Sequence, residues 1–499
     1  MLLPALALAV LTAANAPQTG AAGNSDGKPI AGEIPVTARS AEAVLLFREG
    51  RLKAINWDCP AASLLLKRAL AIETDFPLAL AWLGKCETGP EGAQETERAL
   101  QLASGLPLTE RMSIEAIAAD KRGDDELVHK LRRQLVDLAP SDWLAQFQLG
   151  VQSQYDSKSQ AAILHLNAAV KLNPQLAEAY NYLGYVLAQQ GMAEEGVQAA
   201  RKFVELKPDE PNAYDSFGEV LLLVGRLDEA EAQFRKATAM SPEFWMAWTG
   251  VAYSRFYRGD FAGGHDAVAQ ARKTPRSEHE SRALTLIDAW ADLGEGRTAE
   301  ALALIDGLER AARDKKSPLA LCWAHFERAE MLLELGQLTG ARGQSSEARR
   351  ALADAGAGEE QNRLRRSLLV LDAAIAEREQ KPAVAARAAA DLADELHRAP
   401  SNTEVRSALH HAEGEAALAA RDPVHAIESL SMCPDSEVFC RQRLALAQEQ
   451  ADQPRAAAET RARLLSLYIR DNVHRGEDPA ALYTRLKMTR KPGVAAIAK

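Results

Sequence analysis

The sequence has few aromatic residues and no excess of positive charge, and its only hydrophobic run is at its beginning. Aromatic residues account for 5% of the 499 residues, whereas apolar residues together account for 47%. This apolar fraction excludes a wholly disordered chain. Most of it comes from Ala and Leu, which favour helix, and β-branched residues are scarce. We therefore expect an almost entirely α-helical protein, longer than one hydrophobic core usually organises.

Positive charge is outweighed throughout the chain. Lys and Arg number 59 against 69 Asp and Glu, which gives a formal net charge of −10. Binding to a phosphate backbone needs a basic surface, so we do not expect a nucleic-acid partner. The densest basic stretch, Arg363 to Arg366, follows Glu359 and Glu360, which indicates a solvated helix face.

The hydrophobic run at the beginning of the chain is short. An apolar segment from Met1 to Leu11 precedes small residues at 12–16, a pattern typical of a secretory signal peptide and too short to span a bilayer. We predict a signal peptide over 1–23, export to a periplasm, and no membrane insertion after its removal. No Lys or Arg precedes the apolar segment, so a cytoplasmic location stays the alternative.

Motifs for chemistry are missing as well. The sequence has no phosphate-binding loop, no dinucleotide fingerprint and no nucleophile elbow. Its 10 histidines are scattered, and the adjacent pair His410 and His411 would point about 100° apart on a helix. We therefore predict no catalytic residues, no metal, no cofactor and no enzymatic activity. An enzyme in the irregular 280–468 region is the remaining, least favoured alternative.

What the sequence does contain is an internal period of 34 residues. It is marked by three glycines and three prolines, at Gly150, Gly184, Gly218, Pro174, Pro208 and Pro242. A second glycine follows the first by seven residues in each copy, at Gly191, Gly225 and Gly259. A period of this length indicates stacked helical hairpins, because one such unit cannot bury its own apolar face.

The repeating unit resembles the tetratricopeptide repeat. From Tyr214 to Pro242 the match holds at nearly every position, including Phe217-Gly218, Gly225 and Ala230. The resemblance implies an all-α, right-handed superhelical solenoid of stacked antiparallel helix hairpins, with about 20 or more helices over the whole chain. Fainter copies on both sides extend the pattern. The predicted organisation is a signal peptide over 1–23, a linker over 24–39, a repeat array over 40–272 that is regular at about 143–272, degenerate repeats over 273–468, and a capping helix with a flexible tail over 469–499.

The resemblance also predicts where a partner binds. In this family the first helix of each unit, helix A, lines the concave groove and contacts the ligand. The matching positions are Phe147, Val151, Tyr155, Asn181, Tyr185, Gln189, Asp215, Glu219, Leu222, Thr249, Tyr253, Phe256 and Tyr257. Asp215 and Glu219 are four residues apart, so they should project side by side. Such a surface suits a protein or peptide partner with apolar anchors and a Lys or Arg.

These features predict a non-enzymatic protein-interaction scaffold. The alternative function is a regulatory or sensory subunit whose catalytic domain lies on a separate chain. The alternative reading of the groove residues is that the aromatic side chains pack inside the superhelix.

Five cysteines complete the candidates. Cys433 and Cys440 flank a turn between two expected helices, and Cys59 and Cys86 should lie at neighbouring ends of stacked hairpins. An exported protein would join each pair in a disulfide and leave Cys322 over. The alternative is that all five are buried thiols of a reduced protein.

Overall fold

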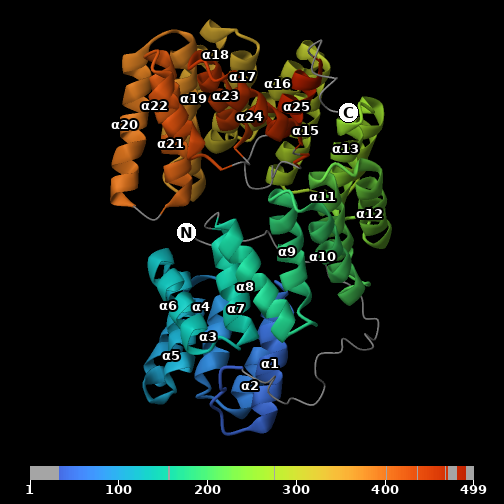
Figure 1. Ribbon diagram of the computed structural model, residues 1–499, viewed down its shortest axis with the longest axis vertical. Coiled ribbons are helices and arrows are strands. Elements are labelled where there is room, and N and C mark those ends of the chain that lie inside the picture. Colours follow the sequence, from blue (N-terminus) through green and yellow to red (C-terminus); the bar gives the residue numbers. More distant parts are fainter. Residues whose placement is uncertain are drawn as a thin grey trace. The chain divides into compact units, whose positions relative to one another are not determined.

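A computed structural model describes residues 33–155, 158–274, 276–399, 402–434, 437–466, 468–469 and 480–490. The predicted signal peptide therefore lies outside the described residues. Within these ranges the regular structure consists of 25 α-helices and one short 3-10 helix, without a strand (Figure 1). The predicted all-α solenoid of helix hairpins is confirmed. None of the helices in this part of the chain is long and apolar enough to cross a membrane.

The chain divides after Pro208 into two compact units, which we call unit 1 and unit 2. Unit 1 contains α1 (Ala41–Ile55), α2 (Cys59–Ile72), α3 (Pro77–Cys86), α4 (Gly89–Leu102), α5 (Leu108–Arg122), α6 (Asp125–Leu138), α7 (Trp143–Tyr155), α8 (Ser159–Leu172), α9 (Ala177–Gln189) and α10 (Ala193–Leu206).

Unit 2 begins with four helices of the regular repeats and continues through longer hairpins. Its helices are α11 (Pro211–Leu223), α12 (Leu227–Met240), α13 (Trp245–Tyr257), α14 (Phe261–Ala271), α15 (Glu278–Glu295), α16 (Thr298–Asp314), α17 (Pro318–Glu334), α18 (Leu338–Asp354), α19 (Glu359–Arg378), α20 (Pro382–Arg398), α21 (Thr403–Ala419), α22 (Pro423–Ser431), α23 (Val438–Gln450), α24 (Pro454–Ser466) and α25 (Ala480–Arg490).

The repeated glycines explain why consecutive helices pair so closely. A Cβ on Gly150 in α7 would lie 2.8 Å from Cγ of Leu166 in α8, and one on Gly218 would lie 2.8 Å from Cε1 of Phe234. Neither position has room for a side chain, so each glycine lets helix A touch helix B of its own hairpin. The second glycine of each copy ends helix A in the left-handed region, as at Gly225 with φ 79°.

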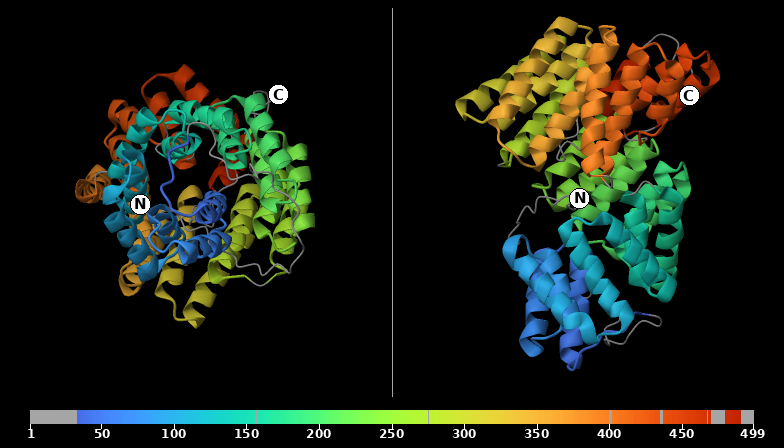
Figure 2. Two further views of the ribbon diagram at one scale, coloured as in Figure 1. Left: turned by 90° about the horizontal axis from the view of Figure 1, so that it is seen from below. Right: turned by 90° about the vertical axis from the view of Figure 1, so that its left-hand side faces the viewer.

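Figure 2 shows the helices of each unit as successive side-by-side rods. Helix A is the odd-numbered member of each pair from α1 to α23, and helix B is the even-numbered one. The interior of each hairpin is closed by small residues and large rings. Ala162, Ala230 and Phe234 are all fully buried, which is where the abundant Ala of this sequence is used.

The last helix does not simply extend the stack. The sequence predicts a capping helix within 469–499, and α25 covers Ala480–Arg490. Its most extensive contact is with α15, followed by α13 and α23, whereas it touches α24 only slightly. In Figure 1 the red α25 accordingly lies beside α15. The chain thus returns to helices that begin roughly 200 residues earlier in the sequence.

Candidate partner-binding faces

In unit 1 the predicted groove residues divide into a packed group and an accessible group. Phe147 is buried and its ring lies 5.9 Å from that of Tyr182, while Val151 packs against the main apolar core. Tyr155 at the end of α7 is 38% exposed. On α9, Asn181 and Tyr185 are half-buried and Gln189 is exposed. The accessible residues of this face are therefore Tyr155, Asn181, Tyr185 and Gln189.

A segment that precedes α1 lies against the helix-A side of unit 1. We call residues 33–40, Glu-Ile-Pro-Val-Thr-Ala-Arg-Ser, the strap. It has no regular secondary structure up to the N-cap of α1, Ser40. The sequence predicted a linker over 24–39, because Gly, Ser, Pro and Thr are frequent there. The described part of that linker is packed against the repeats, and the main-chain amides of Ile34, Thr37, Arg39 and Ser40 are hydrogen-bonded.

Three buried carboxylates accept the main-chain amides of the strap. The Ile34 amide donates to Asp142 Oδ2 at 2.6 Å. Both groups of Thr37 donate to Glu110, the amide to Oε2 at 2.9 Å and the hydroxyl to Oε1 at 2.6 Å. The amides of Arg39 and Ser40 donate to Glu73 Oε2 at 2.8 and 3.0 Å. The three carboxylate residues are 3% exposed (Asp142), 0% exposed (Glu110) and 6% exposed (Glu73).

Side chains hold the beginning of the strap. Trp143 Nε1 donates to Glu33 Oε1 at 2.7 Å, and the guanidinium groups of Arg51 and Arg48 lie 3.4 and 3.3 Å from the same carboxylate. Burial raises the pKa of Asp142, and this effect outweighs the amide hydrogen bonds from Ile34 and Ala145, which lower it. A small pocket lies beneath this part of the strap, lined among others by Arg51 and Asp142.

In unit 2 most of the predicted groove residues are buried. Asp215 is 4% exposed and Thr249 is 5% exposed, whereas Tyr253 and Phe256 are completely buried. The ring of Phe256 lies 5.1 Å from that of His265 in α14, so it belongs to the core between α13 and α14. These four residues cannot contact a partner without repacking. The reading in which groove aromatics pack inside the superhelix therefore applies to Tyr253 and Phe256.

The other predicted residues of unit 2 differ among themselves. Leu222 is fully buried, and Glu219, the expected companion of Asp215, is half-buried. Tyr257 is half-buried and is covered by residues from near the end of the chain. Its hydroxyl donates to the carbonyl oxygen of Ile469, and its ring lies 5.4 Å from that of Tyr468 in an edge-to-face arrangement. The exposed surface predicted for Tyr257 is thus occupied by the chain itself.

Helix α25 makes specific contacts on the helix-A side of unit 2. The Tyr483 ring lies 5.2 Å from that of Trp290 in α15, and Lys487 Nζ lies 2.6 Å from Glu334 Oε2 in α17. Gly294 in α15 leaves room for Leu486, because a Cβ there would be 2.6 Å from Leu486 Cδ1. Burial lowers the pKa of Lys487, but the ion pair with Glu334 raises it by more, so the lysine stays charged.

Ion pairs continue from Lys487 along successive A helices. We call this series the ion-pair chain. Arg378 lies 3.8 Å from Glu334 and 3.4 Å from Glu377. Arg443 lies 2.6 Å from Glu377 and 2.8 Å from Glu415, and Glu415 lies 3.6 Å from His411. Burial would raise the pKa of Glu415, but Arg443 and His411 lower it to about 2. The carboxylate is therefore ionised although its side chain is only 1% exposed.

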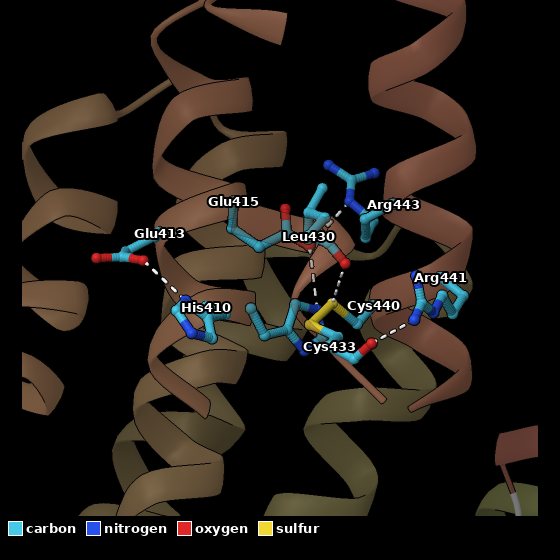
Figure 3. Close-up of a disulfide and its surroundings, with 9 residues drawn as sticks. His410, Glu413, Glu415, Leu430, Cys433, Cys440, Arg441 and Arg443 are labelled. Carbon is cyan, nitrogen blue, oxygen red and sulfur yellow. Dashed lines mark hydrogen bonds and ion pairs between the residues drawn. A yellow bond between two sulfur atoms is a disulfide. The ribbon is translucent and has the colours of Figure 1, made fainter. Parts of the chain in front are cut away.

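The cysteines fall into three environments. Cys433 and Cys440 are joined in a disulfide that links the end of α22 to the beginning of α23 (Figure 3). Cys59 and Cys86 are free thiols that share a hydrogen bond, which lowers the pKa of Cys59 and raises that of Cys86. Cys322 is a buried thiol whose pKa burial raises to about 12. The two ends that hold Cys59 and Cys86 do meet, but the structure contains no second bond.

One group of side chains has the composition of a metal site. Ligand atoms of His265, Asp292 and Glu295 lie within 4.8 Å of one another. However, Arg297 forms ion pairs with both carboxylates and a contact of 2.7 Å with His265 Nε2. A cationic side chain thus already fills the position that a metal ion would take. The group is an internal ion-pair network.

The strap-binding residues were missed by sequence reasoning. Glu73 follows a B helix, Glu110 lies in the first turn of an A helix, and Asp142 precedes one. They do not occupy the same place in their repeats, so no periodic signal marks them.

Comparisons with known proteins agree with the repeat pattern. The tetratricopeptide repeat model matches residues 177–210 and 211–244, which correspond to α9 with α10 and α11 with α12. No curated protein matches the sequence.

Several solved structures resemble parts of the chain. MamA from Desulfovibrio magneticus RS-1 is 16% identical over 33% of this chain and 92% of its own, with a TM-score of 0.31. YrrB, described as a TPR protein with an unusual peptide-binding site, is 18% identical over 36% of this chain and 91% of its own, with a TM-score of 0.30. A repeat protein from Parabacteroides merdae is 14% identical over 54% of this chain and 92% of its own, with a TM-score of 0.34. The family match shows two tetratricopeptide repeats over residues 177–244, and the 34-residue period with its glycine-packed hairpins extends the same hairpin pattern to the neighbouring helices.

Proposed function

We propose that this protein is a non-enzymatic scaffold that binds a partner protein or peptide on the helix-A faces of its repeats. Protein–protein interaction is the general role of tetratricopeptide repeats. The observation that carries the proposal is the strap, because unit 1 holds eight consecutive residues of peptide chain through buried carboxylates. A face that satisfies the main-chain amides of one peptide has the chemistry to bind another.

The accessible part of the helix-A side supplies the contact surface. Tyr155 and Tyr185 lie on neighbouring A helices, α7 and α9, and neither is fully buried. Tyrosine is enriched among residues that dominate binding energy, since it offers a large apolar area and a polar tip. Tyr253 is unsuitable for a test of this surface, because replacing a fully buried ring would destabilise the fold.

The scaffold function is tested by recovering partners from the native host with the full-length chain and with a Tyr155→Ala/Tyr185→Ala variant. Leu164→Ala is the matched control, since Leu164 is 65% exposed but lies on α8, a B helix. We expect the double variant to lose a specific partner by about tenfold, as two lost aromatic contacts imply. The control should recover that partner in full. Equal recovery of every partner by the double variant would refute the assignment of this surface.

We further propose that the protein is exported to an oxidising compartment such as the periplasm. The disulfide between Cys433 and Cys440 supports this location, because such bonds persist in oxidising environments. Protein isolated from its native compartment under non-reducing, denaturing conditions should have free thiols only at Cys59, Cys86 and Cys322. Reaction of all five cysteines with a thiol reagent before reduction would contradict export.

A further inference from the structure

We propose that the strap face of unit 1 is a binding site for an extended peptide, and that residues 33–40 are its resident ligand in cis. The partner segment that this site accepts follows the sequence of the strap. It has an acidic residue at the position of Glu33, apolar residues at the positions of Ile34 and Val36, and a Ser or Thr at the position of Thr37. This inference rests on the proposed scaffold function and specifies its ligand.

The main-chain contacts show why an extended chain fits. The amides of Ile34 and Thr37 donate to carboxylates from adjoining repeats, Asp142 before α7 and Glu110 on α5. Three extended residues span about 10 Å. This length is similar to the spacing of about 8–10 Å between packed helices. A peptide strand that crosses the A helices can therefore place one amide on each repeat.

Glu110 indicates what kind of peptide the site accepts. Its side chain is fully buried, and each of its oxygens accepts a hydrogen bond from Thr37, one from the amide and one from the hydroxyl. Removal of the strap forfeits both of these hydrogen bonds, so a segment that restores them is favoured over one that cannot. Another segment with a Ser or Thr at this position supplies the same two donors.

The ends of the pattern supply specificity. The carboxylate of Glu33 meets Trp143 Nε1 and the guanidinium groups of Arg48 and Arg51. Ile34 packs against an apolar cluster that includes Met112 and Leu135. Main-chain hydrogen bonds thus give affinity for any extended chain, whereas the acidic and apolar subsites select the sequence.

The resident strap must compete with any partner for this site. It is continuous with α1, and a short connection of this kind gives an effective concentration in the millimolar range or above. An incoming peptide therefore binds weakly to the unmodified chain and tightly once the strap is dislodged. Tighter peptide binding after release of the strap is expected if the strap is a resident ligand. It is not expected if the strap is merely structural.

The test measures binding of a fluorescent, N-acetylated peptide of residues 33–40 to the full-length chain by anisotropy. An Ile34→Asp/Val36→Asp variant places charges on the apolar side of the strap and releases it. We expect this opened variant to bind the peptide at least about tenfold more tightly than the unmodified chain. Leu164→Ala, which alters an exposed side chain of α8 outside the strap and its contacts, is the control and should bind like the unmodified chain.

Further substitutions in the opened variant test the site itself. Glu110→Gln should weaken peptide binding by about tenfold, because one of its two acceptor oxygens is lost. Glu115→Gln, the same change at a 42% exposed carboxylate of α5, should leave it unchanged. A peptide with Lys at the position of Glu33 should also bind about tenfold more weakly. Circular dichroism confirms that each variant is folded.

Two results would overturn the proposal. One is a peptide that binds the unmodified and the opened chains equally or binds neither of them. The other is binding to the opened variant that survives both Glu110→Gln and the charge reversal in the peptide. Failure here with partner recovery still dependent on Tyr155 and Tyr185 would leave the scaffold function standing and remove only this peptide site.

Discussion

Replacement of Arg443 by Met should cause a large loss of stability in unit 2. The arginine side chain is 12% exposed, and its guanidinium group lies 2.6 Å from Glu377 and 2.8 Å from Glu415. The two glutamate side chains are 9% and 1% exposed. Methionine fills a similar volume without a charge, so the variant keeps the packing and removes the cation shared by both buried carboxylates, leaving Glu377 with Arg378 and Glu415 with His411.

The expected cost can be derived in two ways. Removing one partner of a buried ion pair typically costs about 3–5 kcal/mol. Independently, the ion pairs hold the pKa of Glu415 at about 2 in place of 4.5. That difference corresponds to about 3 kcal/mol of stabilisation at neutral pH. Both routes predict a loss of about 3 kcal/mol or more for Arg443→Met.

The stabilisation by Glu415 depends on pH in a predictable direction. Because the pKa of Glu415 is depressed in the folded protein, its contribution is present above about pH 4.5 and is lost as the pH falls toward 2. The difference in free energy of unfolding between the unmodified chain and Arg443→Met should therefore be largest near pH 7. It should shrink as the pH falls, because burial raises the pKa of the variant's carboxylates once Arg443 is gone and they become protonated before those of the unmodified chain.

Hydrogen exchange of peptides from α21 and α23 is the appropriate assay, since repeat arrays do not unfold as one cooperative unit. Arg461→Met is the matched control, because Arg461 and Glu449 are 40% and 45% exposed and their ion pair is worth less than about 1 kcal/mol. Adding Glu377→Gln and Glu415→Gln to the Arg443 variant should restore at least half of the lost protection. A loss below about 1 kcal/mol, or one that is the same at pH 7 and pH 4, would refute the assignment of a buried charge pair.

Three further predictions concern other parts of unit 2. Burial and Arg297 lower the pKa of His265, but ion pairs with Asp288 and Asp292 raise it by more. The stabilising effect of His265 is therefore complete below about pH 6.5 and is lost as the pH rises through the folded pKa. Thermal melts of His265→Asn should lack this pH dependence. Lys487→Ala should increase hydrogen exchange in α25 by about tenfold or more, with no increase at α21, and unchanged exchange in α25 would contradict the anchoring role of the pair with Glu334. Gly250→Ala should destabilise α12 and α13 by about 1–2 kcal/mol, measured by hydrogen exchange of peptides from these helices, despite the better helix propensity of alanine. The reason is that the new Cβ would lie 2.4 Å from Cδ1 of Phe234, and Phe234→Leu in the same chain should reduce that loss.

The sequence by itself determined the hairpins and their order. Gly150 and Gly218 mark where helix A meets helix B, and Gly191 and Gly225 mark where helix A ends. These signals are readable because the contacts that they serve join residues fewer than 34 positions apart, and each recurs with the period. The same local character made the turn between Cys433 and Cys440 a recognisable place for a disulfide.

Tertiary structure alone decided which predicted groove residues of the helix-A side are exposed and which are buried. The family pattern assigned Phe256 to the groove, but the ring packs against α14, because a shift of one helical position changes the face on which a side chain lies. The motif therefore predicted correctly which helices carry these residues, but it did not predict which of the side chains are exposed.

Tertiary structure also decided what covers these faces. Ile34 bonds to Asp142 across 108 residues, and Tyr257 bonds to Ile469 across 212. Contacts over such separations leave no mark in local periodicity, since each partner looks like an ordinary linker, cap or loop residue in its own segment. The strap binds carboxylates, and α25 packs against aromatic rings, that the stacked hairpins leave uncovered. These surfaces form only when the hairpins are assembled, so the sequence of one segment does not reveal them.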